Sequence, residues 1–357
     1  MLQTGTYSIR DLLAFNQTPT AQYDPAAIAQ ALADDNASHN RNVQAMLSAF
    51  AEVTTERVGA VPTPGTGSMI RVNEDGAVQT RKTPTPDQQN YPLYKFQHGA
   101  GMTEDYLMRA TPSDLAIIQR TAQRAHINSL RLEMLKALLN PTNRQERDRF
   151  RDGMQLKVKA LHNGDGVAPY GGPNGEVFDG THSHYLAAAT VTAVAVSGLI
   201  ATVGEHTDNA NIQLWISRAQ EADVRALPGF SAYLDSRVIP AALLANTQYL
   251  VGNQGLDQSN PGNRAIGIYD GAEVFVKPYI PANYLTALDA NATSKPLRQR
   301  QSDLAAQRGL RLAGGSMAHP LEARYWEDYF GFGAHDRAAA AALYIGGASY
   351  VAPTLGG

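Results

Sequence analysis

The chain has 357 residues, with 30 lysine and arginine residues against 33 aspartate and glutamate residues, and no cysteine. This length predicts about two domains, or one large domain with insertions. The formal net charge of −3 excludes a strongly basic nucleic-acid coat, and the lack of cysteine excludes disulfides, thiolate metal sites and thiol nucleophiles. Charged residues make up only 18% of the chain, against about 25% in an average soluble domain, so the surface is short of charge.

The N-terminal part is expected to hold an arm and a helix. Residues 1–23 are predicted to be an extended arm. Asp24 is a good helix cap and Pro25 suits the first helical position. An apolar stripe at helical spacing then runs from Ile28 to Val53. Poor helix formers at residues 36–40 interrupt it, which leaves two helices or one long helix open.

Residues 59–101 differ from the rest because they carry many prolines and glycines and few large apolar side chains. Two short runs, 69–72 and 77–80, flank an Asn-Glu-Asp-Gly turn and predict a hairpin. A compact domain seldom carries forty such residues, so we expect this segment to act outside the core.

The clearest helix in the sequence begins at Thr111 and Pro112, with Asp114 in its first turn. Apolar residues follow at helical spacing until Asn140 and Pro141 stop the helix. The helix therefore runs from Pro112 to Leu139, or roughly 42 Å at 1.5 Å per residue.

The second half of the chain is predicted to mix helices with strands and hairpins. The most apolar stretch, residues 185–203, holds serine and threonine among small side chains, so we expect a buried helix and not a membrane span. An Asp-Gly pair at Asp270 predicts a type I′ hairpin. The pattern is α+β without a regular βαβ repeat. The expected elements are a loop at 164–180, helices at 190–205 and 217–227, a hairpin at 265–276, and strands at 212–216, 284–288, 325–332 and 339–345.

Five aromatic residues fall within residues 325–333. At strand spacing Tyr325 and Tyr329 face one way, whereas Trp326, Phe330 and Phe332 face the other. Large apolar side chains on both faces indicate a strand that is buried on both sides or lies at an interface.

Candidate catalytic and metal-binding patterns are weak. His182 and His184 could place two imidazoles on one side of a strand, but no third ligand lies close in sequence, and histidines that pack in a loop are the better interpretation. The glycine-rich loop at 164–175 lacks the residues of a phosphate-binding motif. No catalytic, cofactor-binding or metal-binding residue is therefore predicted, and no cofactor.

An enzyme is the alternative of a different class. The nucleophile elbow GxSxG and the HExxH motif are both absent. Because the residues of a Ser-His-Asp triad are distant in sequence, a hydrolase remains open. Such an enzyme would bring His182, His184 or His319 beside a carboxylate.

The mixed charges of residues 144–159 indicate a solvated face.

The order of these elements resembles the major capsid protein of tailed bacteriophages, which has the Hong Kong 97-type fold. The resemblance covers nearly the whole chain. It is carried by segments that resemble the return of the extended loop into the spine helix, both ends of the axial domain, and the closing strands. These segments are residues 91–108, 180–186, 271–281 and 330–347.

The resemblance implies a role for each region. The expected regions are 1–57 as N-terminal arm and helix, 58–103 as extended loop, 104–180 as peripheral domain with the spine helix at 111–140, 181–274 as axial domain, and 275–357 as the return of the peripheral domain. Lys82 and Lys95 lie in the loop region, but no partner for a covalent cross-link can be matched, so none is predicted.

The resemblance also implies the function and the partners. A head protein would assemble with copies of itself into hexamers and pentamers around double-stranded DNA, with scaffold, portal and possible decoration proteins, weak non-specific contact to DNA, and no membrane. It would be located in the virion after assembly in the host bacterial cytoplasm. An encapsulin compartment shell is the second structural alternative. Since interface centres are depleted in charge, either shell would explain the low charged fraction.

Overall fold

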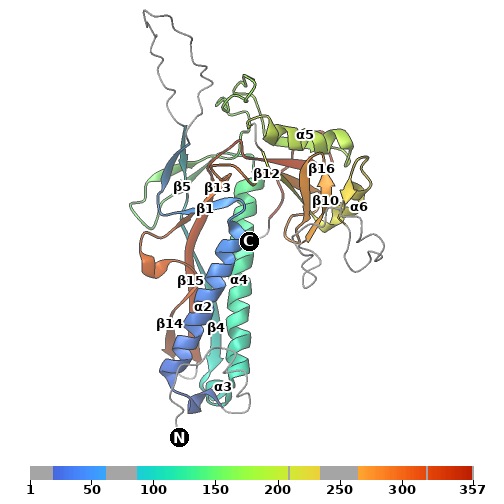
Figure 1. The fold of residues 1–357 in the computed structure, drawn as a ribbon. Coiled ribbons are helices and arrows are strands. Elements are labelled where there is room, and N and C mark those ends of the chain that lie inside the picture. Colours follow the sequence, from blue (N-terminus) through green and yellow to red (C-terminus); the bar gives the residue numbers. More distant parts are fainter. Residues whose placement is uncertain (1–18, 62–86, 208–209, 234–263, 319–320, 356–357) are drawn as a thin grey trace, which may run out of the picture.

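The computed structural model describes residues 19–61, 87–207, 210–233, 264–318 and 321–355. Figure 1 shows an elongated part, in which α2 and α4 run side by side with β4, β14 and β15, and a broader part in which α5 lies against a sheet that contains β12 and β16. We call the first part the rod and the second the seven-stranded body. No helix in the described ranges is both long and apolar enough to cross a membrane.

Runs of strands are interrupted by helices along the described chain. The helical elements are η1 (Thr20–Gln22), α2 (Pro25–Leu47), α3 (Glu104–Arg109), α4 (Pro112–Leu139), α5 (Ala193–Gly204), η2 (Arg218–Gln220), α6 (Glu221–Arg225) and η3 (Ala305–Gln307). The strands are β1 (Ala51–Thr54), β2 (Val58–Val61), β3 (Asp87–Asn90), β4 (Tyr94–Thr103), β5 (Arg144–Arg147), β6 (Gln155–Val158), β7 (Tyr185–Ala188), β8 (Ile212–Ile216), β9 (Ser231–Ala232), β10 (Arg264–Tyr269), β11 (Ala272–Val276), β12 (Tyr284–Asp289), β13 (Leu297–Gln301), β14 (Arg311–Ala318), β15 (Leu321–Ala334) and β16 (Ala340–Ile345).

The first helix is one continuous element and not two. The Asp24 carboxylate accepts a hydrogen bond from the Ala26 backbone at 3.0 Å, as expected of a cap. The weak middle is helical because its polar side chains contact α4: the Gln119 amide donates to Asn36 Oδ1, and His39 Nε2 lies 3.0 Å from His126 Nδ1. Tertiary contacts thus override the low helix propensity of this segment.

Two expectations for the N-terminal part are wrong in detail. Val53 does not continue the helix, because residues Ala51–Thr54 form β1, which pairs in parallel with β13. Within the expected extended arm, Thr20–Gln22 is a short 3₁₀ helix, and the Thr20 backbone donates to the Ala110 carbonyl at 2.8 Å. The rest of the arm and the predicted 69–80 hairpin lie outside the described residues. Strands β2 and β3, which come directly before and after residues 62–86, pair with each other.

The long helix α4 has the predicted bounds, Pro112–Leu139. Both the backbone N–H and the hydroxyl of Thr111 donate to the Asp114 carboxylate at 2.8 Å, which closes the first turn. Leu130 and Met134 on its inner face are buried in the larger of the two main core clusters.

The sheet of the rod is organised around β15. One edge of β15 pairs with β4 over ten residues, and the other edge pairs first with β14 and then with β13. As predicted, aromatic side chains on both faces of β15 are buried: Tyr329 on one side and Trp326 and Phe330 on the other. Tyr325 is the exception, since it is 39% exposed.

The seven-stranded body has the strand order β7-β16-β12-β8-β11-β10-β9, and α5 packs on it. The β10–β11 hairpin turns at Asp270 and Gly271, whose φ angles of 47° and 77° fit the predicted type I′ turn. Strands β8, β12 and β16 confirm the expected strands. The apolar stretch 185–203 is not a single helix, because its first four residues form β7 and the helix begins only after the Thr192 cap.

A buried ion pair fixes β13 to the loop that follows β5. Arg300 Nη1 lies 2.9 Å from Asp148 Oδ2 and also donates to the Tyr91 carbonyl at 3.1 Å. Both side chains are almost completely buried. Because a single buried charge is costly, each partner depends on the other.

The substitution Asp148→Asn should therefore destabilise the folded chain strongly. It keeps the side-chain volume but leaves the Arg300 charge buried and unpaired, which costs about 3 kcal/mol in the free energy of unfolding, measured by urea denaturation. The matched control is Asp152→Asn, which breaks the solvent-exposed pair with Arg57 and should change stability much less. Equal losses in the two variants would contradict this prediction.

A second chain of polar contacts links α2, α4 and β15. His126 Nε2 lies 2.8 Å from Asp328 Oδ2, and His126 Nδ1 faces His39 Nε2. Burial, followed by the neighbouring His126, lowers the pKa of His39 from 6.5 to about 4. Between these two values the unfolded chain binds more protons than the folded chain, so stability falls as the pH falls from about 6.5 towards 4.

The variant His39→Gln should flatten this pH dependence. Wild type should lose about 1 kcal/mol more than the variant between pH 7 and pH 5, after allowance for the partial exposure of His39. Urea denaturation at the two pH values measures the difference. Parallel pH profiles for the two proteins would show that His39 does not contribute.

Candidate functional site

Large apolar side chains are exposed at several separate places on the described surface. Tyr106, Met108 and Ile117 lie on α3 and the first turns of α4, and Ile117 is 61% exposed. Val177 and Val194 lie near α5 and are 87% and 85% exposed. Exposed apolar side chains that gather in patches are typical of surfaces that contact other proteins.

A third group of exposed apolar side chains lies on two adjacent loops. Phe150 and Met154 flank the turn after β5, and Leu304 precedes η3. The two loops are adjacent, since Arg151 Nη1 lies 3.7 Å from Asp303 Oδ2. The apolar surface is therefore spread over both the rod and the seven-stranded body.

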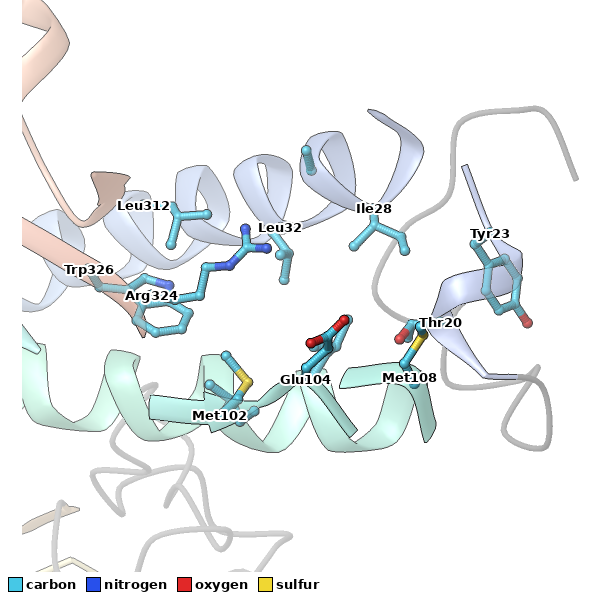
Figure 2. A pocket seen from close by; sticks show the side chains of 13 residues that line it. Thr20, Tyr23, Ile28, Leu32, Met102, Glu104, Met108, Leu312, Arg324 and Trp326 are labelled. Atoms are coloured by element: carbon cyan, nitrogen blue, oxygen red, sulfur yellow. The ribbon is translucent and has the colours of Figure 1, made fainter. Parts of the chain in front are cut away.

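An apolar pocket of about 440 Å³ lies at the end of the rod near the described N-terminus. Figure 2 shows Ile28 and Leu32 of α2 on one side, Met102 and Met108 on the other, and Trp326 at one end. Two charged side chains, Glu104 and Arg324, also line it. The lining residues are Thr20, Tyr23, Ile28, Ala29, Leu32, Met102, Glu104, Met108, Leu115, Ile118, Leu312, Arg324 and Trp326. This lining suits an apolar group and offers no histidine, so it resembles a contact surface more than a catalytic centre.

A cluster of histidines lies beside β7. His182 and His184 come from the segment that leads into β7, and Glu205 and His206 directly follow α5. One donor atom from each of the four side chains lies within 4.8 Å of the others. We call these four residues the histidine cluster.

Backbone carbonyls orient two of the imidazoles. His184 Nδ1 lies 2.8 Å from the Ala340 carbonyl oxygen, and His206 Nδ1 lies 3.0 Å from the Tyr170 carbonyl oxygen. A carbonyl only accepts, so each Nδ1 carries the hydrogen and each Nε2 is left with a lone pair in the neutral ring. These two Nε2 atoms are 3.1 Å apart.

The other two members complete the cluster. Glu205 Oε1 lies 3.1 Å from His182 Nε2 and 3.7 Å from His206 Nε2. His182 Nε2 and Glu205 Oε1 are buried and have no hydrogen-bond partner among the described residues. The Phe178 ring covers the cluster, with centroid distances of 4.7 Å to His182 and 4.5 Å to His206.

Burial keeps the imidazoles neutral. It lowers the pKa of His206 from 6.5 to about 4, and it also lowers the pKa values of His182 and His184. Burial, followed by the charge of Glu176, raises the pKa of Glu205. Burial therefore favours the neutral form of each imidazole, which carries one lone pair on the ring.

Sequence reasoning noted His182 and His184 but missed Glu205 and His206. The latter lie more than twenty positions further along, and only the packing of α5 against the sheet brings them to the first pair. The one signal in the sequence for these two residues was Gly-Glu-His, which follows the apolar stretch 185–203. A helix was expected to end there, and the C-terminus of a helix favours a cation.

The structure shows only part of the arrangement that the hydrolase alternative requires. His182 and His184 do lie beside a carboxylate, whereas His319 is outside the described residues. Within the part of the chain that the structure describes, no serine or threonine hydroxyl is hydrogen-bonded to an imidazole of the cluster. A nucleophile activated by a histidine base needs such a contact.

The lysines considered for cross-linking have different outcomes. Lys95 lies in β4, and its ammonium is 2.8 Å from Glu327 Oε2 on β15. Lys82 falls outside the described residues. Lys95 therefore takes part in pairing β4 with β15 within the chain.

Comparison with solved structures identifies the fold. No protein-family model matches the chain, and no curated protein sequence matches it. A solved structure named "Mycobacterium phage Patience" has 24% sequence identity and a TM-score of 0.65, and the match covers 99% of this chain and 96% of that chain. The chain has the Hong Kong 97-type fold. This confirms the α+β fold class expected from the sequence.

Two more distant structures also match. One is named as the capsid of an empty GTA particle, with 18% identity, a TM-score of 0.49, and coverage of 84% of this chain and 89% of that chain. The other is a holo-SrpI encapsulin complex from Synechococcus elongatus PCC 7942, with 10% identity, a TM-score of 0.45, and coverage of 87% and 90%. Within the Hong Kong 97-type fold of this chain, the apolar pocket lies in the rod and the histidine cluster beside the seven-stranded body.

Proposed function

We propose that this chain is the major capsid protein of a tailed bacteriophage, a shell subunit that assembles with copies of itself into hexamers and pentamers around double-stranded DNA. The observation that carries the proposal is the Hong Kong 97-type fold, matched over 99% of the chain by a structure from a phage. In this proposal residues 58–103 form the extended loop, α4 is the spine helix, and residues 181–274 form the axial domain.

The surface of the subunit supports a role in assembly. Exposed apolar side chains occur on α3 and α4, at the loops around Phe150 and Leu304, and beside α5. A shell subunit meets neighbours on several sides, so separate patches fit this role better than a single binding face does. The charged fraction of 18% agrees, because buried interface centres hold few charges.

The proposed partners follow from the same role. They are other copies of the subunit, a scaffold, a portal and possible decoration proteins, with no membrane partner. A subunit with a net charge of −3 would contact the packaged DNA only weakly and without sequence preference. Its place would be the virion, after assembly in the host cytoplasm, and its role would be structural and not enzymatic.

Electron microscopy of the purified chain, alone and with its scaffold, tests the proposal. We expect closed icosahedral shells whose contents in a phage lysate are DNA. Shells that enclose a protein cargo and no genome would instead support the encapsulin alternative. A chain that stays monomeric under every condition, including in a lysate, would refute both.

The substitution Ile117→Asp should block assembly without unfolding the subunit. Ile117 is exposed on α4, so a charge there leaves the core intact but opposes burial against a neighbour. We expect the yield of shells to fall by at least about tenfold, because each 1.4 kcal/mol of lost contact energy changes an equilibrium constant tenfold. Sedimentation measures the shells, and thermal unfolding measures the subunit.

The matched control is Asn128→Asp, which introduces the same charge at an exposed polar position of α4. It should leave the thermal stability of the subunit unchanged and affect assembly less than Ile117→Asp does. If Ile117→Asp assembles as well as wild type, this face of α4 is not an interface.

A further inference from the structure

We propose that the histidine cluster is a binding site for one divalent transition-metal ion, best fitted by Zn²⁺, with His182, His184, Glu205 and His206 as its four ligands. The inference is independent of the proposed shell function, since it concerns a site within a single subunit.

The first argument is the conflict between two lone pairs. The Ala340 and Tyr170 carbonyls hold the hydrogens of His184 and His206 on Nδ1, so the two Nε2 lone pairs face each other at 3.1 Å. Two acceptors at this distance repel unless a cation or a proton lies between them. Both rings are buried, and each Nδ1 already faces a carbonyl oxygen. A metal cation removes the conflict at neutral pH.

The second argument is the spacing of the donor atoms. Zinc bonds of about 2.0–2.1 Å to imidazole nitrogen, in tetrahedral geometry, place neighbouring ligand atoms roughly 3.3–3.4 Å apart. In the cluster the Nε2 atoms of His184 and His206 are 3.1 Å apart, and Glu205 Oε1 lies 3.1 Å and 3.7 Å from His182 and His206. Small side-chain movements would bring these four atoms around one ion.

The third argument is that His182 Nε2 and Glu205 Oε1 have no other partner. Both atoms are buried, and apart from the 3.1 Å approach to each other neither has a hydrogen-bond partner among the described residues. Buried polar atoms are rarely left unsatisfied in folded proteins. An ion bound between the four side chains would satisfy both atoms at once.

The surroundings of the cluster also favour a metal ion. Ligating histidines usually donate their second ring N–H to a carbonyl or carboxylate, as His184 and His206 do here. Glu205 and His206 follow the C-terminus of α5, whose partial negative charge attracts a cation. The Phe178 ring packs against His182 and His206.

The ligand set selects the class of metal. Three imidazoles and one carboxylate suit zinc and its neighbours, whereas magnesium and calcium prefer oxygen ligands throughout. With four protein ligands a tetrahedral zinc has no open position for a substrate, which is the arrangement of a structural site. The ion would fasten the end of α5 to the segment that leads into β7.

Zinc binding to the full-length chain without a histidine tag tests the inference. The protein is stripped with a chelator and dialysed, and ZnCl₂ is then added. We expect isothermal titration and elemental analysis to give one zinc ion per chain. Thermal unfolding should shift to higher temperature with zinc, because the ion binds the folded chain. Co²⁺ should give the intense visible absorption of a four-coordinate ion.

Three variants complete the test. Glu205→Gln and His182→Gln each remove one ligand with little change of volume and should weaken zinc binding at least about 10–100-fold, the range found even for residues that only support ligands. The control His98→Gln removes a half-buried histidine from β4, outside the cluster, and should bind zinc as wild type does.

Two results would overturn the inference. The first is a wild-type chain that takes up no stoichiometric zinc and gives no four-coordinate Co²⁺ spectrum. The second is undiminished zinc binding by Glu205→Gln and His182→Gln. Since the Co²⁺ spectrum is recorded on wild type, a variant that fails to fold does not weaken the test. Failure to form shells would leave the result unchanged, because binding is measured on unassembled subunits.

Discussion

The docking of β15 against α4 is the contact on which the rest of the rod depends. Trp326 on β15 donates its indole N–H to the Gln119 side chain at 2.8 Å, and Asp328 accepts from His126 at 2.8 Å. These polar contacts fix which residues of the strand lie on which turn of the helix, because a slip of one residue would turn each side chain to the other face of β15. Phe330 packs against the same helix, with its ring centroid 5.9 Å from that of His126.

This constraint extends outward from β15 on both edges. On one edge β15 pairs with β4, which leads directly into α3 and α4. On the other edge it pairs with β13, which in turn pairs with β1. The helix α2 reaches the same network through His39 and Asn36. The rod is thus a long, narrow unit stabilised by contacts between distant segments, and large apolar side chains on α3 and α4 stay exposed on it.

The polar groups that order the rod are the ones that looked least informative in the sequence. Asn36 and His39 appeared to interrupt a helix, since their propensity favours turns and caps. In the folded chain they are contacts to α4, so the helix continues through them. The sequence around His182 and His184 likewise did not show that Glu205 and His206, at the end of α5, lie beside them. Propensity describes only local free energy, whereas both outcomes arise from packing between segments.

The sequence by itself determined the elements whose ends depend on neighbouring residues. Thr111 and Asn140 mark the two ends of α4, and Asp270 begins the turn of the β10–β11 hairpin, because caps and turns depend on a few neighbouring residues. The order of the elements, through its resemblance to a known family, indicated the fold. Only the tertiary structure decided that β1 pairs in parallel with β13, that Ala51–Thr54 leaves the helical pattern, and that three imidazoles and a carboxylate converge beside β7. These features join segments far apart in the chain, and their free energy comes from burial and register, which no local pattern records.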